Sequence, residues 1–438
     1  MNILIKNGRV IDPANNIDEI LDIFVKGDKI SRIGNNLENL REELEIDKTI
    51  DASNKWVTPG LIDLHVHLRE PGYEYKETIK TGTRSAVMGG FTTICCMPNT
   101  KPITDSEIVV EYINMKAQRE GVCKVLPLGA ITVDQKGEIL SDIGKMAKVG
   151  ICAISEDGGT VANPALMKSG IKYASMFNIP VFSHCEELSL ARGSMNVGDT
   201  AERLGLKGIT NESESLIVSR DMILADCQGL PIHLCHISTK ESLELIRDAK
   251  ARGSKVTAEV TPHHFTLIDE DITDYDGNYK MNPPLRSRQD REAVLEALKN
   301  NTLEVIATDH APHHVDEKNC EFEKSANGIV GLETAIALSI SELVLKDVLT
   351  PLELIAKLTK NPAKILNRED IGSLKVGNTA DVTIIDPEEV YKIDSSKFES
   401  LGKNTPFDSR EVTGKVIYTI VNGKIVVENS EIIVENLN

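Results

Sequence analysis

The sequence predicts an α/β fold, a TIM (β/α)8 barrel with a small β-sandwich domain formed by the N- and C-terminal segments. Three observations lead to this prediction. Eight apolar, β-rich runs alternate with helix-like stretches through the middle of the 438 residues. Both ends of the chain carry short strand and hairpin patterns. All ten histidines lie between residues 65 and 314, which indicates a central chemical domain with structural flanks.

The central runs are nearly continuously apolar, as expected of parallel strands buried on both faces. They occupy residues 61–67, 91–99, 124–132, 151–157, 180–186, 231–238, 255–263 and 303–312. Helical patterns follow most of them, most clearly at 242–253 and 332–345. Eight strand–helix units in about 300 residues indicate a barrel. The alternative is an open doubly wound sheet, but no GxGxxG follows the first run to favour dinucleotide binding.

The two ends of the chain share a pattern of short strands. Residues 26–29 (KGDK) form a hairpin-turn pattern near the start, and Asn422-Gly423 near the end is the strongest short-range hairpin signal. Neither end has enough apolar residues for a core of its own, so we expect both to join in one β domain. The predicted division is 1–57 and 373–438 for the two parts of that domain and 58–372 for the barrel.

The composition of the chain argues against several classes of function. The net charge of −18 argues against nucleic-acid and membrane-surface partners, because both are polyanions. No signal-peptide core or long apolar stretch occurs, so we expect a cytoplasmic protein. The eight cysteines contain no CxxC pair, and most lie in apolar runs, which predicts small buried side chains rather than a zinc ribbon.

The predicted strand ends carry the residues that point to chemistry. Active sites of such barrels lie at the C-terminal ends of the strands. Those ends hold His65, His67, Asn99, Asp157, His184, His236, His263 and Asp309. His65 and His67 share one face of a strand, so both imidazoles can reach one ion. Four imidazoles with two carboxylates suit zinc or another late divalent metal, and six ligands exceed one tetrahedral ion, which indicates two metals.

The two carboxylates are expected to differ in role. Asp157 closes the fourth run and is the natural bridge between two metals. Glu156 is its rival, but should point to the other face, and Gly158-Gly159 after Asp157 provides a tight turn beside the site. Asp309 ends the eighth run. A carboxylate there can accept a proton from an attacking water and pass it to a leaving nitrogen.

A cationic group lies beside the histidine pair. Arg69 follows it by two residues, and a guanidinium at the barrel mouth can hold a substrate carboxylate by paired hydrogen bonds. His313 could donate to the same carboxylate, and from the sequence His314 could do so equally. Three further histidines are expected to have structural or supporting roles: His233, His263 and His264.

Nine motifs in order resemble a known family. They are PGLIDLHVHLREPG, TTICCMPNT, SEDG, FSHCE, HLCHIST, EVTPHHF, KMNPPLR, ATDHAPH and NGIVGLET. Together they resemble class I dihydroorotase of the amidohydrolase superfamily, over nearly the whole chain. The resemblance implies reversible interconversion of N-carbamoyl-L-aspartate and (S)-dihydroorotate in de novo pyrimidine synthesis. It implies zinc as the cofactor, two ions per subunit or one, with Asp309 as the proton shuttle for zinc-activated water.

The resemblance also assigns roles by motif. The implied zinc ligands are His65, His67, Asp157, His184, His236 and Asp309. The first two with Asp309 would hold one ion, the other two histidines the second, and Asp157 would bridge them. The implied substrate contacts are Arg69, Asn99 and His313 to the carboxylate, Asn282 to the ring, and Asn327 and Gly328 from a loop. A homodimer is expected, and association with aspartate transcarbamoylase is a further expectation.

Two departures and two alternatives accompany the resemblance. Many superfamily members bridge their metals with a carboxylated lysine on strand four, but ICAISEDGG has none, which favours the Asp-bridged type. Where related enzymes often have Phe-Gly, this chain has Asn327-Gly328, which puts packing against the substrate ring in question. The alternatives are another cyclic amidohydrolase, of hydantoinase or allantoinase type, and a non-catalytic scaffold subunit.

Overall fold

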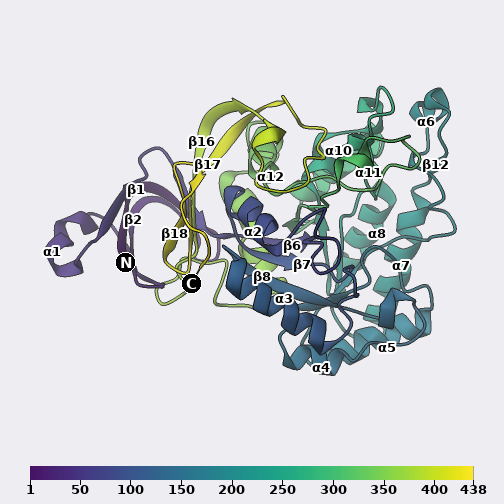
Figure 1. Cartoon of the computed structure of the whole chain (residues 1–438), viewed down its shortest axis with the longest axis horizontal. Helices are drawn as coiled ribbons and strands as arrows, with labels where there is room; N and C mark the ends of the chain where they lie inside the picture. Colours follow the sequence, from purple (N-terminus) through teal and green to yellow (C-terminus); the bar gives the residue numbers. More distant parts are fainter. Residues whose placement is uncertain (438) are drawn as a thin grey trace.

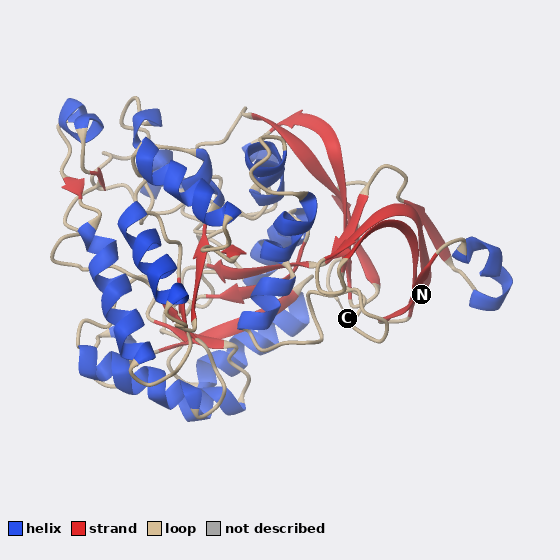
Figure 2. Cartoon of the chain, turned by 180° about the vertical axis from the view of Figure 1, so that it is seen from behind, coloured by secondary structure: helices blue, strands red, loops and turns tan. Residues whose placement is uncertain are grey.

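The computed structural model describes residues 1–437. Its centre is a parallel eight-stranded sheet in the order β15-β14-β13-β10-β9-β8-β7-β6, surrounded by helices (Figures 1 and 2). The fold-class prediction is confirmed. The strands are β6 (Leu61–Val66), β7 (Phe91–Cys96), β8 (Lys124–Ala130), β9 (Ala153–Ser155), β10 (Val181–Ser183), β13 (Ile232–Leu234), β14 (Val256–Val260) and β15 (Val305–Ile306).

Contacts between the first and eighth strands nearly close this sheet into a barrel. The backbone N–H of His67 donates to the carbonyl of His310 at 2.8 Å. The carboxylate of Asp63 accepts hydrogen bonds from the backbone N–H groups of both His65 and Thr308. Because Asp63 lies on β6 and Thr308 follows β15, its side chain joins the two edges of the sheet.

The longer helices pack around the barrel. They are α2 (Ile79–Met88), α3 (Glu107–Glu120), α4 (Ile143–Lys148), α5 (Pro164–Ser175), α7 (Glu212–Asp226), α8 (Lys240–Ala251), α10 (Arg288–Lys299) and α13 (Pro351–Leu358). Hydroxyl caps define several starts: Thr239 accepts from the N–H of Ser242 in α8, and Ser287 forms a capping box with Asp290 in α10. The predicted helix at 242–253 is therefore observed two residues earlier.

Shorter elements fill the connections. The helices are α1 (Arg41–Leu44), α6 (Asp199–Leu204), α9 (Pro262–Thr266), α11 (Val315–Lys318), α12 (Ala335–Ser339), α14 (Lys360–Ile365) and a π-helix, η5 (Ile340–Val344). The 3-10 turns are η1 (Leu37–Leu40), η2 (Val133–Gln135), η3 (Asp269–Asp271), η4 (Gly277–Tyr279) and η6 (Ser395–Lys397). A two-stranded sheet pairs β11 (Met195–Asn196) with β12 (Gly208–Ile209).

Two sequence expectations need correction in this part of the chain. His263 does not end a strand, because β14 stops at Val260 and Pro262 begins α9, where a proline without an N–H is well tolerated. The helix expected over 332–345 begins only at Ala335 and continues from Ile340 as a π-helix.

Strands from both ends of the chain form a second sheet of nine strands. Its strands are β1 (Asn2–Asp12), β2 (Ile17–Lys26), β3 (Lys29–Gly34), β4 (Lys48–Asp51), β5 (Trp56–Pro59), β16 (Val382–Lys392), β17 (Glu411–Val421), β18 (Lys424–Glu428) and β19 (Glu431–Ile432). The order is β19-β18-β17-β16-β5-β1-β2-β3, with β4 also paired to β1. Figure 1 shows strands from the two ends of the chain together in this curled sheet. The exact domain division at 57/58 and 372/373 stays a prediction.

Both predicted hairpin turns lie where the sequence pattern placed them. Lys26 pairs with Lys29 across Gly27-Asp28, and Val421 pairs with Lys424 across Asn422-Gly423. The φ angles of Asn422 and Gly423 are 51° and 71°, the left-handed values that such two-residue turns require.

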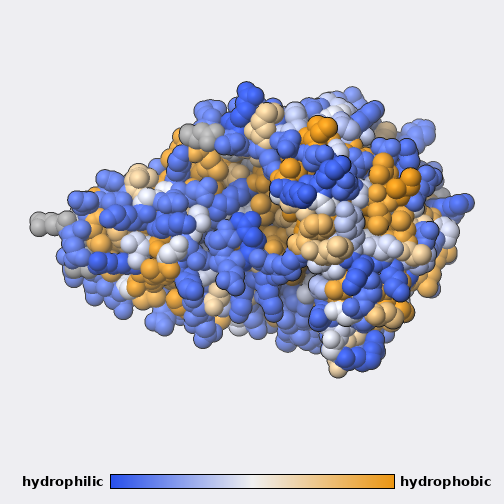
Figure 3. Space-filling view, turned by 90° about the horizontal axis from the view of Figure 1, so that it is seen from below, coloured by the Kyte–Doolittle hydropathy of each residue, from blue (hydrophilic) through white to orange (hydrophobic). Residues whose placement is uncertain are grey.

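The helices and one face of the surface, within residues 1–437, can be compared with what a membrane span requires. None of the helices described is both long and apolar enough to pass through a bilayer. Figure 3 shows one face on which hydrophilic residues predominate and apolar residues lie in separate patches.

Candidate metal centre and substrate cavity

Asp157 lies at the centre of the four predicted imidazole ligands. Its carboxylate oxygens are 3.3 Å from His65 Nε2, 3.4 Å from His67 Nε2, 3.3 Å from His184 Nδ1 and 3.6 Å from His236 Nε2. The rival Glu156 points elsewhere and accepts hydrogen bonds from Thr132. The geometry thus brings Asp157, and not Glu156, to the position that a bridging ligand would need.

Asp309 approaches the first histidine pair from the other side. Its Oδ1 is 3.0 Å from His67 Nε2 and 3.5 Å from His65 Nε2. The ring nitrogens His184 Nδ1 and His236 Nε2 lie 2.9 Å apart. All six predicted ligands therefore meet at the C-terminal ends of the barrel strands.

Among the predicted metal ligands, two buried imidazole nitrogens lack a hydrogen-bond partner within the described residues. They are His65 Nε2 and His184 Nε2; His263 Nε2, which is not a predicted ligand, is unpartnered too. A buried polar atom without a partner is unfavourable unless something else binds it. With neighbouring carboxylates, these nitrogens form a donor set typical of zinc and related divalent ions. The residues present therefore fit a metal centre.

The electrostatics of the site favour a positive charge between the predicted ligands. Burial opposes a charge on His65, but Asp157 and Asp309 raise its pKa well above the ordinary value. Against the same effect of burial, Asp157 and Glu186 raise the pKa of His184 to about 10. Burial would raise the pKa of Asp309, yet His65 and His67 lower it, which keeps the group a carboxylate. A divalent cation can supply this positive charge in place of protons.

The strand ends turn sharply to aim their side chains inward. Arg69, His236 and Asp309 have φ angles of 61°, 34° and 47°, values in the left-handed region that residues other than glycine rarely adopt. Such strain is found where a fold holds a functional side chain in place. These three residues lie two or three positions after the ends of β6, β13 and β15.

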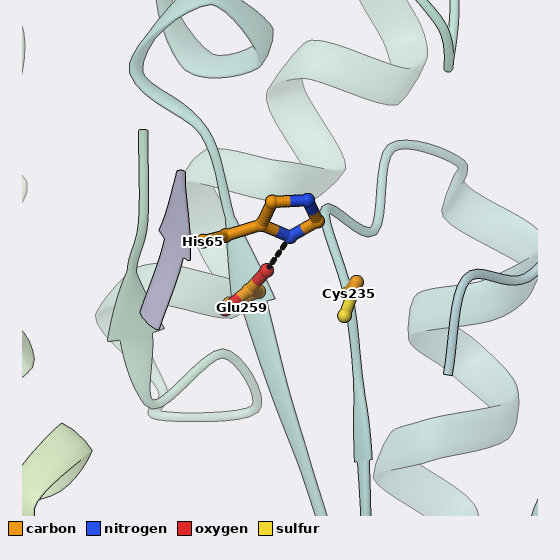
Figure 4. A group of neighbouring side chains, drawn as sticks. All are labelled: His65, Cys235 and Glu259. Carbon is orange, nitrogen blue, oxygen red and sulfur yellow. Dashed lines mark hydrogen bonds and ion pairs between the residues drawn. The ribbon is translucent and has the colours of Figure 1, made fainter. Parts of the chain in front are cut away.

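A buried carboxylate behind His65 was not identified from the sequence. Glu259 Oε1 accepts a hydrogen bond from His65 Nδ1 at 2.9 Å, and its Oε2 lies 3.0 Å from His233 Nε2 (Figure 4). Despite complete burial, these imidazoles lower its pKa to about 2. The bond fixes the proton of His65 on Nδ1 and leaves Nε2 free for a metal. Cys235 lies beside the pair.

A cavity of about 240 Å³ opens directly onto these groups. All six predicted substrate contacts line it: Arg69, Asn99, Asn282, His313, Asn327 and Gly328. Of the six predicted metal ligands, only His65 is absent from the lining. His314, which the sequence left open against His313, is half exposed at its side chain and pairs with Asp316.

Several of these cavity residues also contact one another. Asn99 Oδ1 lies 2.9 Å from His67 Nδ1 and orients that ring. His313 Nε2 donates to the carbonyl of Asn327 at 2.8 Å and lies 3.3 Å from Arg69 Nη2. Asn282 Nδ2 donates to Glu186 at 2.8 Å. These contacts hold the polar side chains that line the cavity in fixed orientations.

Comparison with known proteins identifies the family of the chain. A family model described as dihydro-orotase-like matches residues 54–242, and an amidohydrolase family model matches residues 325–427. The dihydroorotase of Acetivibrio thermocellus is 50% identical over 97% of this chain and 98% of its own. That of Geobacter metallireducens is also 50% identical, over 97% and 99%. The chain belongs to the dihydroorotase family.

Solved structures of hydantoinases and dihydropyrimidinases share this fold. An L-hydantoinase (dihydropyrimidinase) from Arthrobacter aurescens superposes with a TM-score of 0.88 at 25% identity, covering 99% of this chain and 97% of that one. A dihydropyrimidinase from Brevibacillus agri gives 0.85 at 22% identity over 99% and 97%. This dihydroorotase-family chain therefore shares its barrel and its terminal sheet with hydantoinase structures.

Two supporting residues escaped the sequence argument because they lie far along the chain from what they support. Glu259 is 194 residues from His65. Asn404, in the KNTPF segment, accepts from the backbone N–H of His313 and donates to the carbonyls of Ala311 and Gly328. The available signal for Glu259 was a charged residue within an otherwise apolar strand run.

Proposed function

We propose that this protein is a dihydroorotase, which interconverts N-carbamoyl-L-aspartate and (S)-dihydroorotate. The observation that carries the proposal is the placement of Arg69 in the wall of the cavity onto which His67, Asp157 and Asp309 also open. Dihydroorotate combines a cyclic amide with a carboxylate. A site with hydrolytic groups on one side and a guanidinium on the other suits both parts of that molecule.

We propose zinc as the metal, with two ions per subunit and one as the alternative. A bound divalent ion would lower the pKa of a water molecule and polarise the ring carbonyl. The HxH pair with Asp309, and His184 with His236, would hold the ions, and Asp157 would contact both. The support is the position of Asp157 within 3.6 Å of all four imidazoles.

The chain itself supplies proton transfer and orientation. Asp309, held as a carboxylate by His65 and His67, takes the proton of the attacking water and delivers it to the ring nitrogen as the ring opens. In the synthetic direction its protonated form assists the loss of water. Arg69 and Asn99 would hold the substrate carboxylate, so that the scissile amide faces Asp309.

An assay on dihydroorotate tests the proposal. The chain is stripped with a chelator and then assayed with and without added zinc, in parallel with hydantoin, allantoin and dihydrouracil, which lack the carboxylate. We expect zinc-dependent turnover of dihydroorotate alone. Preference for an uncharged ring would instead support a hydantoinase-type enzyme, and an intact chain that binds no zinc would support a scaffold.

The role of Arg69 has its own test. Arg69→Met should raise the KM for dihydroorotate by about 100-fold, since a charge-assisted pair at a desolvated site contributes roughly 3 kcal/mol. Arg84→Met, which removes a peripheral arginine paired with Glu399, is the matched control and should leave KM unchanged. An unaltered KM in Arg69→Met would remove this residue from the carboxylate site.

The assembly stays a prediction. A homodimer is expected, and association with aspartate transcarbamoylase is the finer expectation. Light scattering of the purified chain, alone and mixed with that enzyme, measures both masses directly.

A further inference from the structure

A buried lysine lies behind the wall of the cavity. Lys318 ends α11, and its side chain is buried, with a residue exposure of 6%. Its Nζ donates three hydrogen bonds to backbone carbonyls: to Lys280 at 3.0 Å, to Ala326 at 2.7 Å and to Gly328 at 2.9 Å. All three N–H groups of the ammonium are therefore used, and each points to main chain.

Those carbonyls belong to the two segments that carry cavity residues. Ala326 and Gly328 flank Asn327, and Lys280 stands two residues before Asn282. The segments also bond directly, because the N–H of Gly328 donates to the carbonyl of Lys280 at 3.0 Å. Lys318 thus lies at the junction where the loop of Asn327 and Gly328 rests on the segment of Asn282.

The type of side chain matters at this position. An ammonium offers three donors and no acceptor, so it can satisfy three converging carbonyls. Burying it away from carboxylates is unfavourable, and burial with help from Lys280 lowers the pKa of Lys318 to about 7. An apolar side chain of similar length would avoid that penalty but would leave the loop without its donors.

We propose that Lys318 is a positioning residue of the substrate site, which fixes the 326–328 loop against the segment of Asn282 so that both face the cavity. This proposal rests on the proposed function, because it takes the cavity as the site of dihydroorotate. The ammonium touches neither the cavity lining side chains nor the predicted metal ligands, and it acts through the backbone that carries Asn282 and Asn327.

The protonation of Lys318 gives the loop a pH dependence. The charged and titratable groups around it are Lys280, which lowers its pKa, Asp276 and Cys320, which raise it, and His313 across the loop. A neutral amine has two N–H groups for three carbonyls, so one loop carbonyl loses its donor. Above about pH 7 the loop should loosen and the KM should rise.

The test compares Lys318→Met with a matched buried lysine. Lys357 is likewise buried, with its pKa lowered to about 8, and donates to Asn301 Oδ1 at 2.9 Å and to the carbonyl of Leu303 at 2.6 Å, away from the cavity lining. We expect Lys318→Met to raise the KM for dihydroorotate tenfold or more, with kcat within threefold and zinc content unchanged. Lys357→Met should leave KM unchanged.

Two further readouts separate positioning from general damage. The KM of the wild type should rise above pH 7, and this rise should be absent in Lys318→Met. Hydrogen exchange at residues 326–330 should be at least tenfold faster in Lys318→Met than in the wild type or Lys357→Met, with the barrel strands unchanged. If Lys318→Met does not fold, Lys318→Gln, which keeps two donors, takes its place.

The outcomes distinguish this proposal from the proposed function. Unchanged KM and unchanged loop exchange in a folded variant would overturn the role of Lys318. A wild type that does not turn over dihydroorotate would overturn the proposed function, while faster loop exchange in Lys318→Met would still support the positioning role. Equal acceleration in Lys357→Met would show that any buried lysine has this effect and would also overturn the proposal.

Discussion

The two sheets of this molecule differ in where their polar side chains lie. Most strands of the barrel are buried along much of their length, as in β6 and β7, and the predicted metal ligands lie at or just beyond the C-terminal ends of the strands. In the terminal sheet, part of β17 alternates buried and half-exposed residues, and the buried positions of the sheet's core are aliphatic. No histidine occurs in the first 64 residues or after residue 314.

This difference indicates a division of labour. The barrel rim holds buried carboxylates, imidazoles and residues with left-handed backbone. Each of these features reduces stability, but together they hold the side chains of the site in place. The terminal sheet holds apolar packing. A substitution at the rim should therefore change chemistry with little effect on unfolding, and a substitution in the terminal sheet should do the reverse.

The largest expected effect is at the rim. Asp309→Asn should lower kcat by roughly 1000-fold or more, because the amide cannot accept the proton. The barrel should still fold, since asparagine matches aspartate in size and shape. Turnover and thermal unfolding measure the two effects. Asp28→Asn, in the β2–β3 turn of the terminal sheet, is the control and should change neither; comparable kcat in both variants would exclude Asp309 as the proton shuttle.

The second prediction concerns the support behind the rim. Glu259→Gln should lower zinc affinity by about 10–100-fold, because a neutral amide no longer strengthens His65 as a ligand. The fold should persist, since Gln Oε1 can accept from His65 and its amide can donate to His233 if that ring carries its proton on Nδ1 toward Thr257. Competition with a chromophoric chelator measures affinity. Wild-type affinity in Glu259→Gln would show that this contact is only structural.

The third prediction tests the terminal sheet. Ile23→Ala in β2 should lower the free energy of unfolding of the sheet by about 2–5 kcal/mol, since Ile23 is fully buried and leaves a cavity. Its kcat should match the wild type. Ile20→Ala, on the same strand but 69% exposed, should change stability by less than about 0.5 kcal/mol. A loss of kcat in Ile23→Ala while it remains folded would break the proposed division.

The last prediction concerns Glu333, which lies between the barrel and the terminal sheet. Glu333 accepts hydrogen bonds from the backbone N–H groups of Glu399 and Ser400, and burial raises its pKa to about 7. The folded chain therefore holds this proton up to about pH 7, while the unfolded chain releases it near its ordinary value of 4.5. The resulting stability is complete below pH 4.5 and is lost as the pH rises through 7, by up to about 3 kcal/mol.

Denaturant titrations between pH 5 and pH 8 measure this loss in the wild type. Glu333→Gln, which cannot ionise, should flatten the pH dependence over that range. The same variant serves as a buried-carboxyl control for Glu259→Gln and should bind zinc normally. A wild-type and a Glu333→Gln curve of equal slope would contradict the assignment.

Local patterns were sufficient for much of this architecture. Apolar runs predicted all eight barrel strands, and Asn422-Gly423 predicted its hairpin, because both signals depend on neighbouring residues. Strand ends were predicted too far along the chain, since residues such as Asp157 and His184 follow the last ladder bond and still lie in the barrel mouth. The HxH spacing placed His65 and His67 together for the same local reason.

Supporting contacts could not be predicted in this way. Lys318 resembles a surface lysine in VDEKN, and only the fold brings the carbonyl of Lys280 to it. The support of His65 by Glu259 joins two strands distant in sequence. The left-handed backbone at Asp309 is likewise set by the bonds of the surrounding loops and not by its residue type.

Because β5 pairs with β16, the terminal sheet can be completed only late in the synthesis of this protein. Pro59 pairs with Val382, so the partner of β5 is made more than 300 residues later. At roughly 5–20 residues per second, that interval lasts on the order of tens of seconds. During it, the free edge of β5 offers unpaired backbone groups to any other strand. A ribosome-bound chain that has not yet reached Val382 is therefore where chaperones would be needed most.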